Sequence, residues 1–336
     1  MYPSSKGFRG RGKGRTFAPK FRNTRIVTHY KYIKDMNVKA FLIAAFATVA
    51  LTVSAATSQN DGVITVKVNK ASKALVEKWI EAYKAVQPNV EIAVVSGKNA
   101  DADLTLVSSH QEGAQVTYVA RYALLPVTTA ENPFLNDIQK KEWKSKDIKS
   151  LFFTAEDLDE EYEEEVEGKH NKLKDKLTVY SGSSKASLSG IFASHFGRTS
   201  DDLRGNRIAG DDFYLLSAIN EDKASVTFNA LSNLYDLSSR TLRSDLVLLP
   251  LGVKASQREA LRSGNLDETL ELIEDEDIDL IPVEEIGFTY NSVDADIDNF
   301  LQWIIRAGQE YNHKAGFLRL TDKEVESQLR LLAQNN

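Results

Sequence analysis

Strand patterns and helix patterns alternate along most of this sequence, and that alternation constrains the fold more than any other feature. Residues 62–69 (GVITVKVN) have the apolar alternation of a strand. The amphipathic pattern that follows predicts a helix ending near Pro88, and 90–95 (VEIAVV) and 102–109 (ADLTLVSS) predict two more strands. Short strands separated by helical patterns are typical of α/β folds with a largely parallel sheet. We therefore predict an α/β protein.

The alternation continues to the end of the chain. A long apolar run at 115–129 predicts a strand, and 132–153 predicts two short helices. The later predicted elements are a strand and turn at 176–184, a helix at 185–196, strands at 224–237 and 244–253, a short helix with a strand at 266–290, a long amphipathic helix at 296–316 and a terminal helix at 321–334. With 336 residues, the chain is long enough for two domains or lobes.

Residues 36–56 (MNVKAFLIAAFATVALTVSAA) have the pattern of a secretory signal peptide. Lys39 supplies the positive charge, and the apolar stretch from Ala40 to Val53 is too short to span a membrane comfortably. Ser54 and Ala56 then satisfy the small-x-small rule for cleavage. We expect export to the periplasm, without a lipid anchor because the chain has no cysteine.

A basic extension, residues 1–35, precedes this signal and holds ten Lys and Arg but a single acid. Its FRGRGKGR run resembles an Arg/Gly nucleic-acid tail. An RNA-binding tail directly before an export signal makes little functional sense, which favours a start assigned too early and Met36 as the true initiator. The remaining chain, with 31 basic and 47 acidic residues, carries a net charge near −16 and is expected not to bind nucleic acid.

No local signature of catalysis is present in the sequence. The four histidines after the signal are not spaced three or four apart, so no metal-binding helix is indicated; they are His110, His170, His195 and His313. The nucleophile elbow, the Walker A loop and the dinucleotide-binding glycine motif are absent. A triad assembled across the fold stays open, but a protein without enzymatic activity, cofactor or metal is favoured. His195 is interpreted as a half-buried helix residue.

The stretch TVYSGSSKASLSGIFASHFG, residues 178–197, predicts a strand that runs through a Gly/Ser turn into a helix. The first amides of a helix lack internal partners and attract anions. Ser183, Ser184 and Ser187 could add hydroxyl donors for such an anion. The alternative is that Ser183 or Ser184 is only the N-cap of the helix. Both interpretations stay open.

An acidic run at 155–168 packs nine carboxylates into fourteen residues. It lacks the alternating Asp/Asn and Gly pattern of a calcium loop. A solvated surface segment is favoured. A docking patch for a basic partner is the other interpretation.

The order of several segments resembles the PstS-like phosphate-binding periplasmic proteins of ABC importers, within the type II solute-binding superfamily. The resemblance covers nearly all of the chain after the signal. It rests on the Asn-Pro pair at 132–133, IKSLFF at 148–153, SVTFNALSNLYD at 225–236 and the stretch 300–320. In that last stretch, the matching positions are Phe300, Trp303, Gly308, Gln309, Gly316 and Leu320.

The resemblance implies a two-lobed periplasmic-binding-protein fold of type II, each lobe a mostly parallel sheet flanked by helices. Lobe 1 would comprise residues 62–125 and 230–336, and lobe 2 residues 126–229. Two crossover strands, near 122–129 and 226–230, would join the lobes. The implied partners are a small anion such as phosphate and an ABC permease in the membrane, and we expect a monomer.

The resemblance carries over to few ligand positions. Ser72 matches the first loop, the short second loop at 96–103 would contribute Lys98, and the ligand Asp expected after the third strand falls on Ser108 or Ser109. The third loop, YSGSSKAS, lacks the family's Arg and Ser-Gly-Thr. The full set of predicted ligand-binding residues is Ser72, Lys98, Ser108, Ser109, Ser181, Ser183, Ser184 and Lys185.

Because these loops lack several of the family's ligand residues, a second function stays open. A binding-protein fold whose ligand loops have degenerated could serve as a protein-interaction module of the cell envelope, without a small ligand. The full length and the Ser-rich turn favour a solute-binding protein. The loss of glycines at two of the three loops favours the module.

Overall fold

The computed structural model describes residues 62–95, 101–108, 115–154, 171–184, 187–290 and 294–335. The chain divides into two compact units, residues 1–61 and 62–336, and all described residues belong to the second. Several predictions fall outside the described residues: the basic extension, the signal peptide, the acidic run at 155–168, and the ligand positions Lys98, Ser109 and Lys185.

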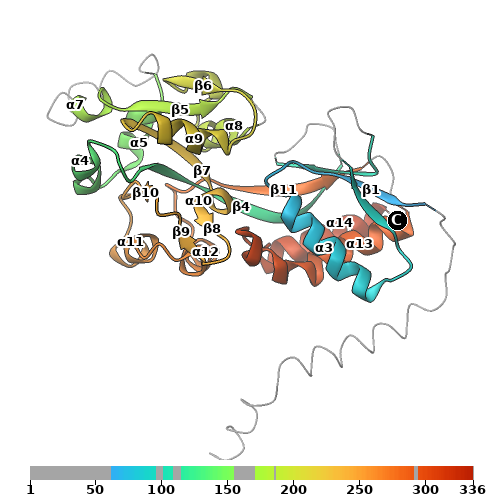
Figure 1. The fold of residues 1–336 in the computed structure, drawn as a ribbon. Coiled ribbons are helices and arrows are strands. Elements are labelled where there is room, and N and C mark those ends of the chain that lie inside the picture. The colour runs from blue at the N-terminus through green and yellow to red at the C-terminus, as the bar shows by residue number, and fades with distance from the viewer. Residues whose placement is uncertain are drawn as a thin grey trace, which may run out of the picture. The chain divides into compact units, whose positions relative to one another are not determined.

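Nine strands of the described chain form one sheet, in the order β2-β1-β3-β11-β4-β7-β5-β6, with β10 paired to β4. Their bounds are β1 Ile64–Lys67, β2 Ile92–Val95, β3 Leu104–Val107, β4 Val116–Thr129, β5 Thr178–Gly182, β6 Asn206–Ile208, β7 Ser225–Ala230, β10 Leu246–Leu248 and β11 Val283–Thr289. The strands at both ends pair in parallel, and the pairs that involve β4 and β11 are antiparallel. The predicted α/β class is confirmed (Figure 1).

The long strand β4 connects the two ends of this sheet. Its first half, up to Ala123, pairs with β11, and its second half, from Leu124, pairs with β7 and β10. Residues 122–129 are all buried, as expected for a strand covered on both faces. Figure 1 shows β4 running from the group of elements around β1 to the group around β5.

Helices pack beside both groups of strands. Their bounds are α3 Lys73–Val86, α4 Leu135–Lys140, α5 Ser145–Phe152, α7 Asn171–Lys174, α8 Leu188–His195, α9 Tyr214–Glu221, α10 Leu231–Leu234, α11 Ala255–Arg262, α12 Leu266–Asp275, α13 Ala295–Arg306 and α14 Asp322–Asn335. Short elements complete the chain: η2 Ser200–Asp202, β8 Tyr235–Asp236, β9 Thr241–Leu242, η3 Gly308–Tyr311 and η4 His313–Ala315. Side-chain caps start three of the described helices, Ser187 at α8, Asn265 at α12 and Asp294 at α13.

Each group has its own aromatic cluster. On the β1 side, Tyr83 of α3 packs on Phe300 of α13 with ring centroids 5.0 Å apart. On the β5 side, Phe192 of α8 stacks on Phe228 of β7 at 3.9 Å. These rings are buried and anchor the helices on the sheet.

Three predicted elements differ from the structure. The strand expected at 224–237 ends at Ala230, where α10 begins, and the helix expected at 185–196 spans only 188–195. The long helix expected at 296–316 ends at Arg306 and is followed by η3 and η4. At that point, the backbone carbonyl of Gly308 accepts a 2.9 Å hydrogen bond from the indole of Trp79, and a Cβ at 308 would lie 3.2 Å from that ring. The close approach favours glycine.

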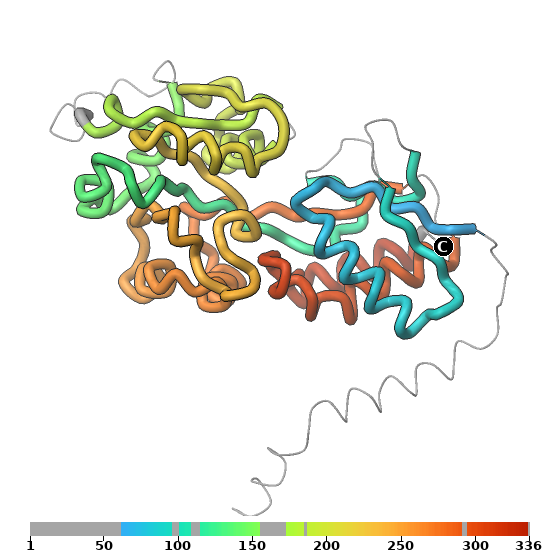
Figure 2. The backbone as a smooth tube through the Cα atoms, viewed as in Figure 1, coloured from blue at the N-terminus to red at the C-terminus, as the bar shows by residue number. Residues whose placement is uncertain are grey.

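Between β7 and β11, the chain packs beside the second half of β4, and only then does β11 pair with the first half of β4. The amide of Trp143 donates to the carbonyl of Pro250 at 2.8 Å, and Arg258 of α11 pairs with Glu142. In Figure 2 the orange segment that includes α11 and α12 lies on the same side as α4 and α5. The division into lobes at 125/126 and 229/230 stays a prediction. The contacts just described join residues 142–143 of predicted lobe 2 to residues 250 and 258 of predicted lobe 1.

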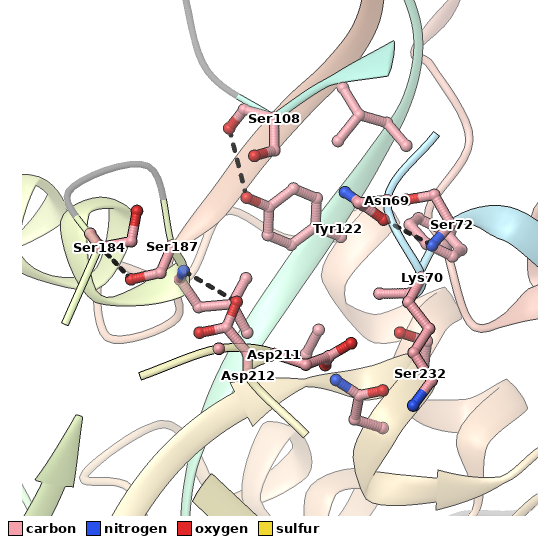
Figure 3. Close-up of a pocket in the computed structure, with 17 residues that line it drawn as sticks. Asn69, Lys70, Ser72, Ser108, Tyr122, Ser184, Ser187, Asp211, Asp212 and Ser232 are labelled. Carbon is pink, nitrogen blue, oxygen red and sulfur yellow. Dashed lines mark hydrogen bonds between the residues drawn. The ribbon is translucent and has the colours of Figure 1, made fainter. Parts of the chain in front are cut away.

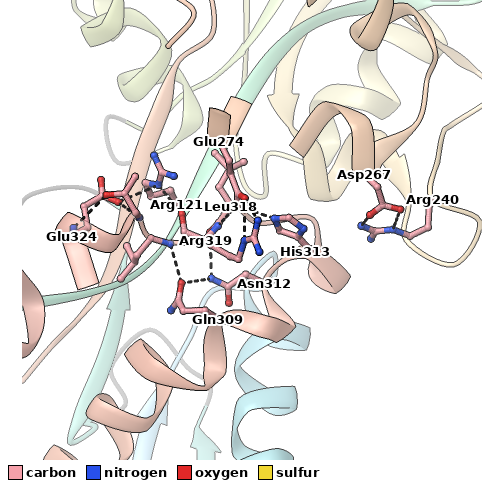
Figure 4. Close-up of polar contacts among 12 residues, drawn as sticks. Arg121, Arg240, Asp267, Glu274, Gln309, Asn312, His313, Leu318, Arg319 and Glu324 are labelled. Carbon is pink, nitrogen blue, oxygen red and sulfur yellow. Dashed lines mark hydrogen bonds and ion pairs between the residues drawn. The ribbon is translucent and has the colours of Figure 1, made fainter. Parts of the chain in front are cut away.

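A half-buried carboxylate ties α12 to the C-terminal segment (Figure 4). Glu274 accepts hydrogen bonds from the His313 ring at 2.8 Å and from the Arg319 amide at 2.6 Å, and its second oxygen pairs with the Arg319 guanidinium. Burial alone would raise the pKa of Glu274, but the hydrogen bonds from His313 and Arg319 outweigh it and lower the pKa to about 2. This cluster holds the segment before β11 against the segment after α13.

No helix among the described residues is long and apolar enough to cross a membrane.

Candidate functional site

A cavity of about 230 Å³ lies where loops from both groups of elements meet (Figure 3). Its lining comes from the β1–α3 loop, the end of β3, β4, the start of α8, the β6–α9 loop, the end of β7 with α10, β11 and the C-terminal segment. The lining residues are Asn69, Lys70, Ala71, Ser72, Ser108, Tyr122, Ser184, Ser187, Leu188, Gly210, Asp211, Asp212, Ala230, Ser232, Asn233, Ile286 and Phe317.

The position of the cavity follows from the topology of the sheet. The parallel strands β1 and β3 on one side, and β5 and β6 on the other, all send their carboxyl-terminal loops into it. Ligands of open α/β sheets bind in the crevice outside the carboxyl ends of the strands. The cavity therefore lies where this class of fold holds its ligands.

The loop after β1 forms one wall. Asn69 Oδ1 accepts a 2.8 Å hydrogen bond from the amide of Ser72, which fixes the turn into α3. Ser72 is almost fully buried at the N-cap position of α3, yet its hydroxyl makes no capping bond. Lys70 is exposed and is the cationic residue of this wall.

The start of α8 forms the facing wall, and Ser187 is its N-cap. The Ser187 hydroxyl accepts from the amide of Ser189 at 3.3 Å and donates to the carbonyl of Ser184. The expectation that Ser183 or Ser184 caps this helix is therefore wrong.

A carboxylate of the protein occupies the remaining part of this helix start. Leu188, the first residue of α8, donates its amide to Asp212 Oδ2 at 3.4 Å. A Cβ on Gly182, at the end of β5, would lie 3.2 Å from Asp212 Oδ1 and 2.8 Å from the Ser187 hydroxyl. Asp212 thus lies above the end of the strand, where an oxyanion on the helix amides would have to sit.

The environment of Asp212 disfavours its negative charge. Its Oδ1 atom is almost inaccessible to solvent and has no hydrogen-bond partner among the described residues. Burial raises the pKa of Asp212 to about 6, the neighbouring Asp211 adds to this rise, and the hydrogen bond from Leu188 opposes it. The carboxylate is held in place without a cation of its own in the part of the chain described.

Buried amides position the loop that carries this carboxylate. Asn229, at the end of β7, has no solvent exposure and donates from its side chain to the backbone carbonyl of Asp212 at 2.7 Å. Asn233 in turn donates to the Asn229 side chain at 2.8 Å. Asp211 accepts from the amide of Phe213 at 2.9 Å, in the turn before α9.

Tyr122 of β4 lines the cavity between the two walls. Its hydroxyl lies 3.4 Å from the carbonyl of Ser108, to which it donates, and its ring is buried. Burial, together with the negative charges of Glu284 and Asp212, raises its pKa well above the usual range. Tyr122 is therefore a neutral hydrogen-bonding group.

The structure brings together only some of the predicted ligand residues. Ser72, Ser108 and Ser184 line the cavity. Ser181 is fully buried within β5 and is not part of the lining, and Ser183 is exposed, with its amide bonded to the carbonyl of Ile208 at 2.9 Å. Whether any of these residues binds a ligand stays a prediction. His195 is exposed rather than half-buried, and its ring bonds to the carbonyl of Asp279 at 2.8 Å.

Seven polar or charged residues of the lining were not identified from the sequence. The missed residues are Asn69, Lys70, Tyr122, Asp211, Asp212, Ser232 and Asn233. A signal was present for two of them, because the Gly-Asp-Asp at 210–212 follows a strand and precedes a helix, where polar ligand loops are found. The described lining residues include two carboxylates and a single cation. The described chain holds no cluster of potential metal ligands.

No family model matches the sequence, and no curated protein matches it. Among solved structures, the chain is similar to a Clostridium perfringens protein assigned as a phosphate ABC transporter substrate-binding protein and crystallised with bound phosphate. The identity is 15%, the TM-score is 0.51, and the match covers 77% of this chain and 100% of that chain. This likeness shows the two-lobed fold that the sequence predicted.

Two further solved structures are similar at lower scores. An ABC-type phosphate transport receptor from Vibrio cholerae has 12% identity, a TM-score of 0.49, and coverage of 76% of this chain and 100% of that chain. The regulatory domain of MetR, a LysR family regulator from N. meningitidis, has 13% identity, a TM-score of 0.43, and coverage of 77% and 99%.

Proposed function

We propose that this chain is an extracytoplasmic solute-binding protein that holds a small solute between two lobes and delivers it to an ABC permease. The observation that carries the proposal is the polar cavity itself. Loops from both groups of elements line it, at the carboxyl ends of their strands, in a fold shared with a substrate-binding protein.

A ligand held from both sides also gives a mechanism. Ser72 and Ser108 come from the β1 side, and Ser187 and Asp212 come from the β5 side. A solute that bonds to both walls stabilises the closed arrangement over an open one, because only the closed form lets it make both sets of contacts. A permease could then distinguish loaded from empty protein.

Export supports the same role. The signal peptide predicted at 36–56 would place the mature chain in the periplasm, where such a receptor has to work. A monomer, an ABC permease as partner, and the absence of enzymatic activity are parts of this proposal.

The ligand predicted from the sequence is a small anion such as phosphate. The serines of the lining and the bound phosphate of the Clostridium perfringens protein support this choice. The charge of the described lining does not support it, because the lining holds two carboxylates, Asp211 and Asp212, and one cation, Lys70. An anion without a positively charged group would meet a carboxylate at the start of α8.

A specific observation favours the second candidate, an envelope interaction module without a small ligand. Asp212 and Ser187 already accept from the first two amides of α8, so the start of this helix is partnered from within the protein. If the chain is such an interaction module, the cavity is the remnant of a solute-binding site that no longer holds a ligand.

A thermal-shift screen separates the two candidates. The protein is unfolded and refolded to remove carried-through solute and is then melted with phosphate, sulfate, carboxylates, sugars, amines and amino acids in turn. Binding to the folded state alone stabilises the protein by RT ln(1 + [L]/Kd), so the melting temperature keeps rising with the logarithm of ligand concentration above Kd. A concentration-dependent rise with one solute class supports the solute-binding protein. No rise with any class favours the module.

A further inference from the structure

The walls of the cavity carry opposite charges. Lys70 lies on the loop after β1, and Asp211 and Asp212 lie on the loop after β6, across the cavity in Figure 3. Tyr122 and the serines between them are neutral donors and acceptors. A ligand that spans the cavity therefore meets an ammonium group at one end and carboxylates at the other.

Two polar atoms of the lining lack partners. Asp212 Oδ1 and the hydroxyl of Ser232 are nearly inaccessible to solvent, and neither has a hydrogen-bond partner among the described residues. Buried polar atoms in native proteins are normally satisfied, so such orphans call for a group that is absent. A carboxylate oxygen only accepts, which means that the missing group is a donor.

The donor needed at Asp212 is best supplied by a cation. Asp212 receives one long hydrogen bond from Leu188, and Asp211 adds a second negative charge nearby. An ammonium group has three donors and a positive charge, so it would satisfy Oδ1 and offset both carboxylates. An oxyanion in this position would instead add a third negative charge.

We propose, on the basis of the function proposed above, that the solute is a small zwitterion of the size of an α-amino acid. Its ammonium group contacts Asp212 and Asp211, and its anionic group faces Lys70. The volume of about 230 Å³ fits such a molecule and is below the roughly 300 to 1,000 Å³ of pockets for drug-sized ligands. The serine hydroxyls of the lining complete the polar contacts.

Titration calorimetry at pH 7.5 on refolded protein tests the proposal. The probes are the common α-amino acids, the fragments ethylamine and propionate, and inorganic phosphate. We expect at least one amino acid to bind, and both fragments to bind at least about tenfold more weakly, because each fragment lacks one of the two charges. Asp212→Asn and Lys70→Gln should each weaken amino-acid binding by about tenfold or more.

Matched controls remove the same charges elsewhere. Asp277→Asn and Lys140→Gln change exposed residues that are not part of the lining and should leave the affinity unchanged. Circular dichroism confirms that each variant is folded before titration.

The outcomes separate this inference from the function on which it rests. Binding of phosphate but of no amino acid, or unchanged affinity in Asp212→Asn, overturns the zwitterion and leaves the solute-binding protein in place. Heat from none of the probes, together with no shift in the thermal screen, overturns both.

Discussion

Replacing Asp212 by asparagine should make the empty protein more stable at neutral pH. The folded protein raises the pKa of this carboxyl from 3.8 to about 6, mainly through burial. The folded state therefore binds the proton more tightly than the unfolded state does, and the ionised carboxylate is a destabilising group. Asparagine keeps an oxygen that can accept from the Leu188 amide but carries no charge.

The magnitude follows from the pKa rise. A rise of about two pKa units corresponds to about 3 kcal/mol, and the partial exposure of the side chain reduces the expected gain to about 1–3 kcal/mol. The penalty is absent below pH 3.8, grows between pH 3.8 and about 6, and is complete above pH 6. The gain from Asp212→Asn should follow the same course and vanish near pH 4.

Urea unfolding of the refolded protein at pH 7.5, pH 6 and pH 4 measures this gain. Ligand has to be absent, because a bound solute would stabilise the wild type and hide the effect. Asp277→Asn, an exposed position, serves as the control and should stay within about 0.5 kcal/mol of the wild type. If Asp212→Asn loses the same stability at all three pH values, Asp212 acts as a structural cap and the reasoning is refuted.

Three further predictions concern the same structure. Amino-acid affinity should fall as the pH drops from 7.5 to 5, because protonation of Asp212 removes the charge that pairs with the ammonium group of the ligand. The other titratable groups of the lining are Asp211, Lys70 and Tyr122. Tighter binding at pH 5 in calorimetry contradicts this prediction. Glu274→Gln should lower the free energy of unfolding in urea at pH 7 by about 1–3 kcal/mol. This loss should shrink as the pH falls from 4.5 toward 2, because protonation of Glu274 removes its stabilising contribution from the wild type as well. A loss that does not change with pH contradicts the prediction. Gly182→Ala should weaken amino-acid binding in calorimetry, because its Cβ would push on Ser187 and Asp212; unchanged affinity contradicts it.

Most of the fold could be predicted from the sequence because its signals are local. The apolar run at 115–129 predicts a strand, and it forms the long strand β4 that connects the two ends of the sheet. The helix predicted at 296–316 ends early for a reason that lies far away in sequence, since the carbonyl of Gly308 bonds to Trp79, 229 residues before it. Such a contact leaves no trace in local periodicity.

The candidate site was only partly predictable. Ser72, Ser108 and Ser184 could be identified because they follow or precede recognisable strands. The Gly-Asp-Asp pattern at 210–212 could have marked a ligand loop, but it does not place Asp212 at the start of α8, because that place depends on how the β6–α9 loop folds and on the support of Asn229. The elevated pKa of Asp212 depends on burial, which no sequence pattern reports.

The most direct test of the account is to identify the solute that the protein carries. Protein purified from its native periplasm without refolding is denatured, and the released small molecules are quantified by mass spectrometry against Asp212→Asn prepared in the same way. The account predicts a stoichiometric amount of one small zwitterion from the wild type and little from the variant. Stoichiometric phosphate would contradict the assigned ligand class, and the absence of any released solute would contradict the solute-binding function.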